Sequence, residues 1–305
     1  MYFANTDPHT MSPPRPLLRL MAYLLCLLLV GGCSMVRVGY GHLDSVAAWM
    51  AHDYFDLNAD QRDAFAQRFA RLHAWHRYEQ LPDYAQFLED MQKRAARDLQ
   101  AADLLWLIDG LRQRYARFAV QGAGDAADLL ATLTPEQIKV FKNQLAKDNQ
   151  KFLREHSSRD SEQERRKAAE RRTLSQLRDW VGRLSDAQET QITVMQQSLP
   201  LMDQLRHEDR LRRQRDFFAL LEIRNGDRKI FTQRLRDWLQ HWEAGRSAQN
   251  AQQFAASWQQ RAEFYAAVHR LLTTEQRSHL QHRLQDYIDD FRRLSEPRPG
   301  VAQSR

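Results

Sequence analysis

The sequence predicts an all-α protein, built as an elongated multi-helix bundle of helical hairpins with at least one long helix and no sheet. Large apolar residues recur three and four positions apart in five segments, which is the spacing of one face of a helix. No stretch after residue 33 alternates convincingly with a period of two, as a half-buried strand would. The chain has only 11 Gly and 9 Pro in 305 residues, which argues against a sandwich or barrel rich in turns. The apolar stripes run through 65–76, 138–152, 174–184, 231–242 and 280–291.

Four of the predicted helices begin with the same local pattern, a leucine followed by a capping residue and then by glutamine three positions after the cap. The side chain of Asn, Ser or Thr at the cap accepts from the free N–H groups of the first turn, and the glutamine bonds back to the cap. The intervals between the four leucines are 76, 51 and 88 residues, so the pattern does not indicate a solenoid of fixed period. The four motifs are Leu57-Asn58 with Gln61, Leu133-Thr134 with Gln137, Leu184-Ser185 with Gln188, and Leu272-Thr273 with Gln276.

Breaker residues and caps divide the chain into predicted helices. Pro82 and the Gly122–Gly124 stretch are expected to end helices, and Pro200 is expected to kink or break one. The segment 157–172 has almost no large apolar residue, so it is predicted to be a solvated part of one long helix, with an exposed joint as the alternative. The predicted helices are 43–55, 58–79, 82–97, 101–121, 134–182, 185–222, 227–245, 247–271 and 274–294.

The N-terminal segment is typical of a lipoprotein signal peptide, predicted over 1–32. Its apolar run 20–30 spans about 16 Å as a helix, too short for about 30 Å of hydrocarbon. Small residues and then Cys33 follow the run, as in a lipobox, so Cys33 is the expected lipidation site; an ordinary secretory signal cut after Gly32 is the alternative. Ser34 next to the lipidated cysteine favours sorting to the outer membrane, facing the periplasm, and translation begins at Met1 or Met11.

The domain organisation that follows has three parts after the signal peptide. Residues 33–42 are expected to form the lipidated N-terminus and a short tether. Residues 43–295 are expected to form the helical domain, with a possible subdivision near 122–133. Residues 296–305 contain proline and are expected to be a disordered tail.

Composition limits the classes of function. The formal net charge of +6 is small beside 45 basic and 39 acidic side chains, so nucleic-acid binding is not indicated. Both cysteines lie within the first 33 residues, which leaves the rest of the chain without a thiol nucleophile or a cysteine metal site. No phosphate-binding glycine loop, serine-hydrolase elbow or metalloprotease motif is present. We therefore expect no enzymatic activity, no cofactor and no small-molecule substrate.

Two clusters are candidate sites. His73, His76 and Glu79 are three residues apart, and two of them with a partner from another helix would suit a metal; packing at a helix junction closed by Pro82 is the favoured alternative. A basic stretch on one predicted helix is a candidate contact for anionic lipid or acidic protein segments, although the acidic residues interleaved with it also fit a solvated face. Its members are Arg206, Arg210, Arg212, Arg213 and Arg215.

The residues after the lipobox resemble an uncharacterised family of proteobacterial lipoproteins, known as a domain of unknown function. The resemblance lies in the segment Val36 to Tyr40, in Trp49, in Tyr54 to Leu57 and in the run Leu72 to Arg77. It implies lipidation and a helical fold over the chain that follows the signal, and it implies no activity. The motifs at 133–137 and 272–276 more weakly resemble the L-T-x-x-Q motif of periplasmic chaperones of the Spy/CpxP kind, which are much smaller and cradle-shaped.

These observations predict a lipid-anchored helical interaction protein of the periplasm, chaperone-like or a scaffold, with a protein client or envelope partner that the sequence does not identify. The first alternative is a structural envelope lipoprotein that bridges the outer membrane and peptidoglycan. The second is a hydrolase or metal-dependent enzyme that uses the His73 cluster.

Overall fold

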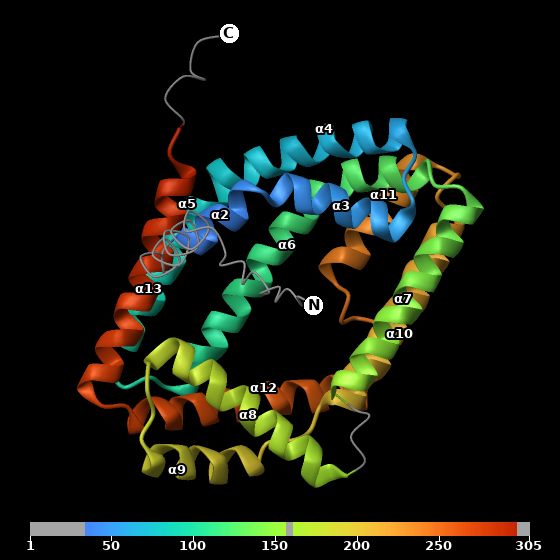
Figure 1. The fold of residues 1–305 in the computed structure, drawn as a ribbon. Coiled ribbons are helices and arrows are strands. Elements are labelled where there is room, and N and C mark those ends of the chain that lie inside the picture. The colour runs from blue at the N-terminus through green and yellow to red at the C-terminus, as the bar shows by residue number, and fades with distance from the viewer. Residues whose placement is uncertain (1–33, 157–160, 298–305) are drawn as a thin grey trace, which may run out of the picture.

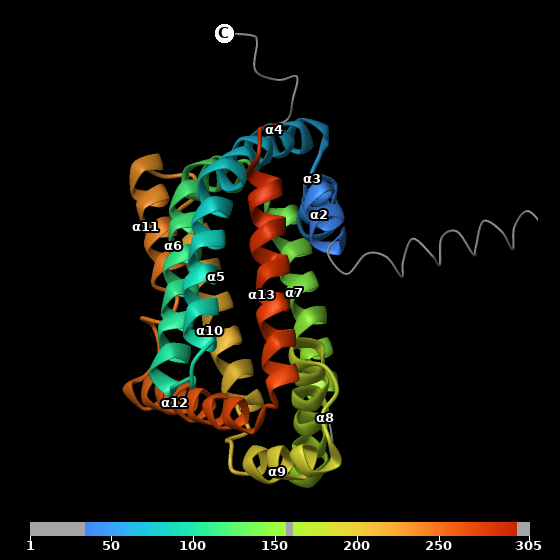
Figure 2. The same cartoon turned by 90° about the vertical axis from the view of Figure 1, so that its left-hand side faces the viewer.

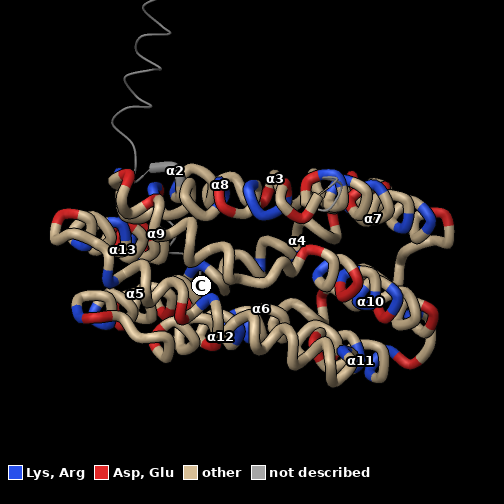
Figure 3. Tube along the Cα trace, turned by 90° about the horizontal axis from the view of Figure 1, so that it is seen from below, with Lys and Arg blue, Asp and Glu red and all other residues tan. Residues whose placement is uncertain are grey.

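The computed structural model describes residues 34–156 and 161–297, and within these ranges every regular element is a helix. The predicted all-α architecture is confirmed. The helices trace a rectangular frame, with α3 and α4 along one side and α8, α9 and α12 along the opposite side (Figure 1). Figure 2 shows α5, α6 and α13 running between α4 at one end and α12 at the other. Figure 3 shows α6, α11 and α12 along one edge of the frame and α3, α7 and α8 along the opposite edge.

Short connections join the helices of the described chain. The α-helices are α2 Ser34–Gly41, α3 Leu43–Phe55, α4 Ala59–Trp75, α5 Leu81–Ala95, α6 Ala101–Ala131, α7 Pro135–His156, α8 Glu162–Val181, α9 Asp186–Gln197, α10 Asp203–Glu222, α11 Arg228–Gln240, α12 Ala248–Leu271 and α13 Thr274–Ser295, and one π-helix, η1, covers His76–Gln80.

The longest described helix is α6, with 31 residues, and it continues through the glycines at 122 and 124. The predicted break at Gly122–Gly124 is therefore wrong. A Cβ at position 122 would lie 3.2 Å from the Leu72 side chain, so the glycine lets α6 pass close to α4. Glycine lowers the stability of a helix by a modest free energy, and the close packing of α6 on α4 offsets that cost.

The predicted single helix over 134–182 is divided into two helices, and residues 157–160 between them lie outside the described part of the chain. Helix α7 ends at His156, and α8 begins anew after Ser161, whose hydroxyl accepts from the Glu164 N–H at 3.1 Å. The predicted helix 185–222 is also divided, because α9 ends at Gln197 and α10 begins at Asp203, on either side of Pro200. Proline has no N–H for the helix ladder, so a break there is expected.

Residues 34–41, expected to be part of a tether, form helix α2 packed against α13. The Arg37 guanidinium lies 3.0 Å from the Asp290 carboxylate, which is buried. The predicted tether is therefore helical from Ser34 to Gly41 and belongs to the described body. Cys33, the signal segment 1–32 and residues 298–305 of the expected tail lie outside the described residues, as does the side chain of Ser34.

A π-helical turn joins α4 to α5 at a corner of the frame (Figure 1). The Leu81 N–H donates to the carbonyl of His76, five residues earlier, and Pro82 follows with no N–H to restore the α-helical register. The sequence predicted a helix end at this proline. The wider turn instead carries the chain around the corner without a loop, and it places His76 on the inner side.

Three apolar cores hold the frame together. One lies between α8, α9 and α12 and includes Ile192 and Val268. The second joins α6, α10 and α11 around the fully buried Phe231. The third packs α5 against α13 through Met91 and Leu284. Because the cores occupy separate parts of the frame, the surfaces between them are left for other contacts.

Candidate functional site

An apolar cavity of about 720 Å³ lies against the inner faces of α3, α4, α5, α6, α8 and α13. Its walls are mostly aliphatic and aromatic, and the described residues that line it include no Asp or Glu. The residues that the later argument uses are Leu43, Val46 and Met50 of α3, Leu111 and Tyr115 of α6, and Trp180 of α8. We call this the apolar cavity.

These six side chains are also among the most exposed large apolar residues of the described chain. Leu111 is 53% exposed, Tyr115 46% and Trp180 39%. A soluble helical surface rarely gathers such residues at one place unless the place binds something. The α3 helix has no fully buried residue: Ala51 and Phe55 pack at the edge of the second core, and Leu43, Val46 and Met50 are turned to this cavity.

Neighbouring aromatic side chains hold His76 in the wall of the apolar cavity. The Tyr40 hydroxyl lies 2.8 Å from Nδ1 of His76, and the rings of Tyr84 and Phe118 meet the same imidazole edge to face. Burial, and then the neighbouring His73, lower the pKa of His76, so its imidazole is neutral at pH 7. His76 therefore adds no charge to the wall at neutral pH.

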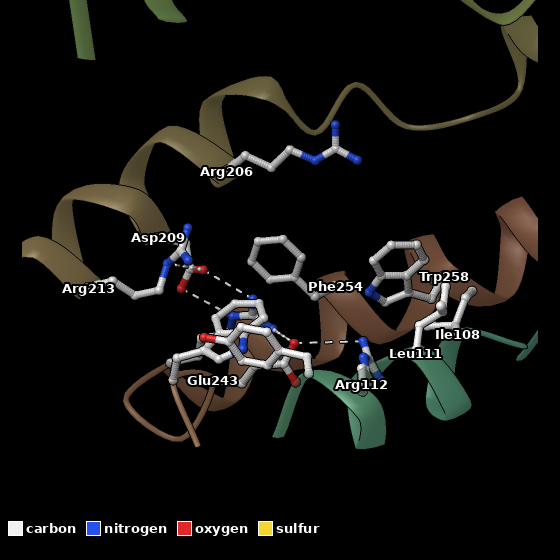
Figure 4. Close-up of a pocket in the computed structure, with 12 residues that line it drawn as sticks. Ile108, Leu111, Arg112, Arg206, Asp209, Arg213, Glu243, Phe254 and Trp258 are labelled. Atoms are coloured by element: carbon white, nitrogen blue, oxygen red, sulfur yellow. Dashed lines mark hydrogen bonds and ion pairs between the residues drawn. The ribbon is translucent and has the colours of Figure 1, made fainter. Parts of the chain in front are cut away.

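A second cavity of about 610 Å³ lies between α6, α10, α12 and the turn that joins α11 to α12. Figure 4 shows Arg206 extending from α10 over Phe254 toward Trp258 of α12, and Arg213 lying beside Asp209. Four arginines and two carboxylates line the cavity, so its formal charge is positive. We call it the arginine cavity, and its lining is Ile108, Leu111, Arg112, Tyr115, Arg206, Asp209, Arg213, Trp242, Glu243, Arg246, Phe254 and Trp258.

Asp209 organises the buried edge of the arginine cavity. Its carboxylate accepts two hydrogen bonds from Arg246, both of 3.1 Å, and two from Arg212, the shorter of 2.9 Å. Burial would raise the pKa of Asp209, but the hydrogen bonds from Arg246 and Arg212 outweigh it, and the pKa is lowered. The guanidinium of Arg246 also lies 3.8 Å from the centre of the Phe254 ring. We assign this network a structural role, because the charges of Asp209, Arg212 and Arg246 already pair with one another.

Arg206 differs from its neighbours. Within the part of the chain that the structure describes, its guanidinium takes part in no ion pair or hydrogen bond, and Figure 4 shows it extended across the cavity beside Phe254. The other members of the predicted basic stretch are separated by the fold. Arg212 and Arg213 face Asp209, Arg210 donates to Asn149 at 2.7 Å, and Arg215 is exposed outside both cavities. The stretch is therefore not one continuous basic surface.

The histidine cluster is also divided. His73 and His76 both contact the Tyr40 ring, at 4.7 and 5.8 Å between centroids, and both line the apolar cavity. Glu79 lies on the π-helix and is exposed. Among the described residues, no group of three or more His, Cys, Asp or Glu side chains is placed to hold a metal ion.

The four leucine–glutamine motifs meet in two pairs at diagonally opposite corners of the frame (Figure 1). At one corner, Nε2 of Gln61 donates to Oε1 of Gln137 at 3.0 Å, and Nε2 of Gln137 donates back to Oε1 of Gln61 at 2.6 Å. Each carboxamide also bonds to the carbonyl just before the partner motif, Thr132 for Gln61 and Asp56 for Gln137.

The second corner repeats this arrangement. Gln188 and Gln276 exchange bonds of 2.8 and 3.0 Å, and they donate to the carbonyls of Leu271 and Arg183, again the residues just before the partner motif. The four predicted capping boxes are present as well, at Asn58, Thr134, Ser185 and Thr273. The sequence predicted only this local role. Pairing across the fold was missed because a single motif contains no information about its partner.

The cavity residues of α3, α6 and α8 were also missed by the sequence patterns. Leu111 and Tyr115 are four residues apart on a helix that is apolar on several sides, so their positions did not distinguish a core face from a binding face. No helix among the described residues is both long and apolar enough to cross a membrane.

Comparison with known proteins identifies a family without a described activity. The family of unknown function DUF6279 matches residues 53–251, which include most of both cavities and three of the four motifs. No curated protein and no solved structure matches the chain.

Proposed function

The chain belongs to the family of unknown function DUF6279, and from the geometry of its cavities we propose that it is a binding protein for other polypeptides, held at the periplasmic face of the outer membrane by lipid on Cys33. The observation that carries the proposal is the gathering of six exposed apolar side chains around one cavity. A concave apolar surface of this kind is the usual form of a site for an apolar segment of a partner.

Two further features support a binding role. The apolar cavity is built on six α-helices and on η1, which belong to different parts of the chain, so the surface is held in shape by the whole frame. The paired glutamines fix two corners of that frame, and one glutamine of each pair, Gln137 or Gln276, belongs to a motif that resembles the L-T-x-x-Q motif of the chaperones. A rigid concave surface lowers the conformational cost of binding.

The test is protection of an aggregating model client, such as reduced lysozyme, by the full chain with and without substitutions in the cavity. Leu111→Ser and Met50→Ser should reduce protection, because each removes an exposed apolar contact without removing a core residue. Val194→Ser is the matched control, since Val194 is exposed on α9 and lies outside the cavity. Equal protection by all three variants would show that the apolar cavity is not the binding surface.

The proposed anchor has a separate test. Cys33→Ala should release the protein from the membrane fraction or leave an uncleaved precursor, and Ser34→Asp should shift it toward the inner membrane. Mass spectrometry that finds membrane-bound protein with an unmodified Cys33 would contradict the anchor. Because α2 begins at Ser34 and packs on α13, an anchored chain would hold the frame close to the membrane surface.

A further inference from the structure

The apolar cavity and the arginine cavity adjoin on the surface of α6. Leu111 and Tyr115 line both cavities, one helical turn apart. Tyr115 also lies close to Arg213, whose positive charge lowers the tyrosine pKa against the larger effect of burial, which raises it. A ligand that lies across Leu111 and Tyr115 would therefore meet an apolar surface on one side and arginines on the other.

The form of the apolar cavity indicates what kind of ligand fits. Its wall offers few hydrogen-bonding groups, so an extended peptide would leave buried backbone groups without partners. The exposure of Leu111, Met50 and Val46, near half in each case, shows a wall open to solvent. An acyl chain needs enclosure on most sides to leave water, whereas a helix satisfies its own backbone and presents only one face to a groove.

The charge of the arginine cavity indicates which helix. Asp209 and Glu243 are already engaged by Arg246, and Arg112 lies 3.7 Å from Glu243, whereas Arg206 extends into the cavity without an acidic partner among the described residues. Arg261 lies near enough that, after burial, the charge of Arg206 is the next cause lowering its pKa. Asp203 offsets part of the charge of Arg261, so the positive potential that an acidic side chain would relieve is centred on Arg206.

We infer that the partner segment is an amphipathic helix that lays its apolar face in the apolar cavity and places acidic side chains in the arginine cavity beside Arg206. This inference rests on the proposed function and names the chemistry of the polypeptide that the same surface accepts.

The experiment measures fluorescence anisotropy of labelled model peptides titrated with the full chain. The peptides share one Leu-rich face and differ in one terminal turn, which carries two Glu, two Lys or two Gln, and each is made with the charged turn at either end. A fourth peptide has the Glu composition with two central prolines, which prevent a helix. Arg206→Glu is the test variant, and Arg215→Glu, on the same helix but outside both cavities, is its control.

We expect the better Glu peptide to bind about three- to tenfold more tightly than its Lys counterpart, because a partly exposed ion pair contributes modestly and two pairs can form. Arg206→Glu should abolish or reverse this preference, Arg215→Glu should leave it unchanged, and salt should reduce it. The proline peptide should bind weakly.

Three results would overturn the inference in different ways. Equal affinity for the Glu, Gln and Lys peptides, with loss of all binding in Leu111→Ser, would leave the proposed function intact and remove the acidic preference. Equal binding of the proline peptide would remove the helix. Binding of phosphatidylglycerol vesicles through Arg206, with no peptide bound, would replace the polypeptide by a lipid headgroup, and would count against the proposed function too.

Discussion

Replacing Gln137 by Glu separates the two roles of the paired glutamines. As a cap, the side chain uses Oε1, which accepts from the Thr134 N–H at 3.0 Å, and a carboxylate can do this equally well. As a partner, the side chain uses Nε2, which donates to the Asp56 carbonyl at 2.9 Å and to Gln61 at 2.6 Å. Glutamate retains the acceptor and loses both donors.

The loss is estimated from these contacts. Two hydrogen bonds at about 1 kcal/mol each are removed, and two buried acceptors then face an oxygen without a proton, at a further cost of about 1 kcal/mol or more. Gln61 cannot relieve this by turning its amide over, because its Nε2 is held by Thr132 and its Oε1 by the Asn58 N–H. A carboxylate at a helix N-terminus regains about 0.3–1 kcal/mol. Gln137→Glu should therefore lower the free energy of unfolding by about 2–3 kcal/mol.

The assay is urea unfolding at pH 7, followed by circular dichroism. Thr134→Ala, which removes only a cap, should cost about 1 kcal/mol and so less than Gln137→Glu. Gln276→Glu should repeat the larger effect at the second corner, where the donors reach Arg183 and Gln188. Glu164→Gln, at the same position of a helix start without a paired motif, should change stability by less than about 0.5 kcal/mol. If Gln137→Glu matched the wild type, the glutamine would be a cap alone.

Three other changes test the packing and the buried charges. Gly110→Ala would place a Cβ 2.3 Å from the Phe87 ring and should cost about 1–3 kcal/mol in a urea titration, whereas Gly124→Ala, with nothing within 4 Å, should not destabilise. Burial, followed by the charge of Arg277, lowers the pKa of His269, so the unfolded chain takes up the proton at a higher pH than the folded chain does. The free energy of unfolding should therefore fall as the pH drops below about 6.5. His269→Gln should remove part of this dependence on pH. Asp209→Ala should lower the free energy of unfolding by about 3–5 kcal/mol, because it leaves the buried Arg246 guanidinium without its carboxylate partner. In the wild type, the stability that this carboxylate contributes should be present above about pH 4 and should disappear as the pH falls through its lowered pKa.

The neutral form of His269 illustrates how much of this protein depends on contacts distant in sequence. Its Nε2 lies 3.2 Å from the Ala95 carbonyl and its Nδ1 3.5 Å from the Leu99 N–H, so one nitrogen donates and the other accepts. The sequence placed this histidine near the end of a helix, which is correct, but it held no sign that the ring would meet the α5–α6 connection. A protonated ring would turn a second donor toward the Leu99 N–H.

The sequence by itself determined the helical class and most helix starts. These depend on apolar spacing and on caps such as Asn58, Ser185 and Thr273, which act within one turn and are legible in a few residues. It did not determine where α6 ends, because Gly122 breaks an isolated helix but permits the close approach of α4 in the folded chain. Local propensity is weak, and packing overrides it.

Only the tertiary structure decided where the candidate site lies. The apolar cavity takes residues from six helices, and an exposed Leu111 has the same sequence signature as a buried one until its neighbours are placed. The basic stretch of α10 likewise reads as one surface, yet Asp209 holds Arg212 and Arg246 in the interior and leaves Arg206 facing the cavity. The strength of these contacts depends on distance and burial, which only the folded chain determines.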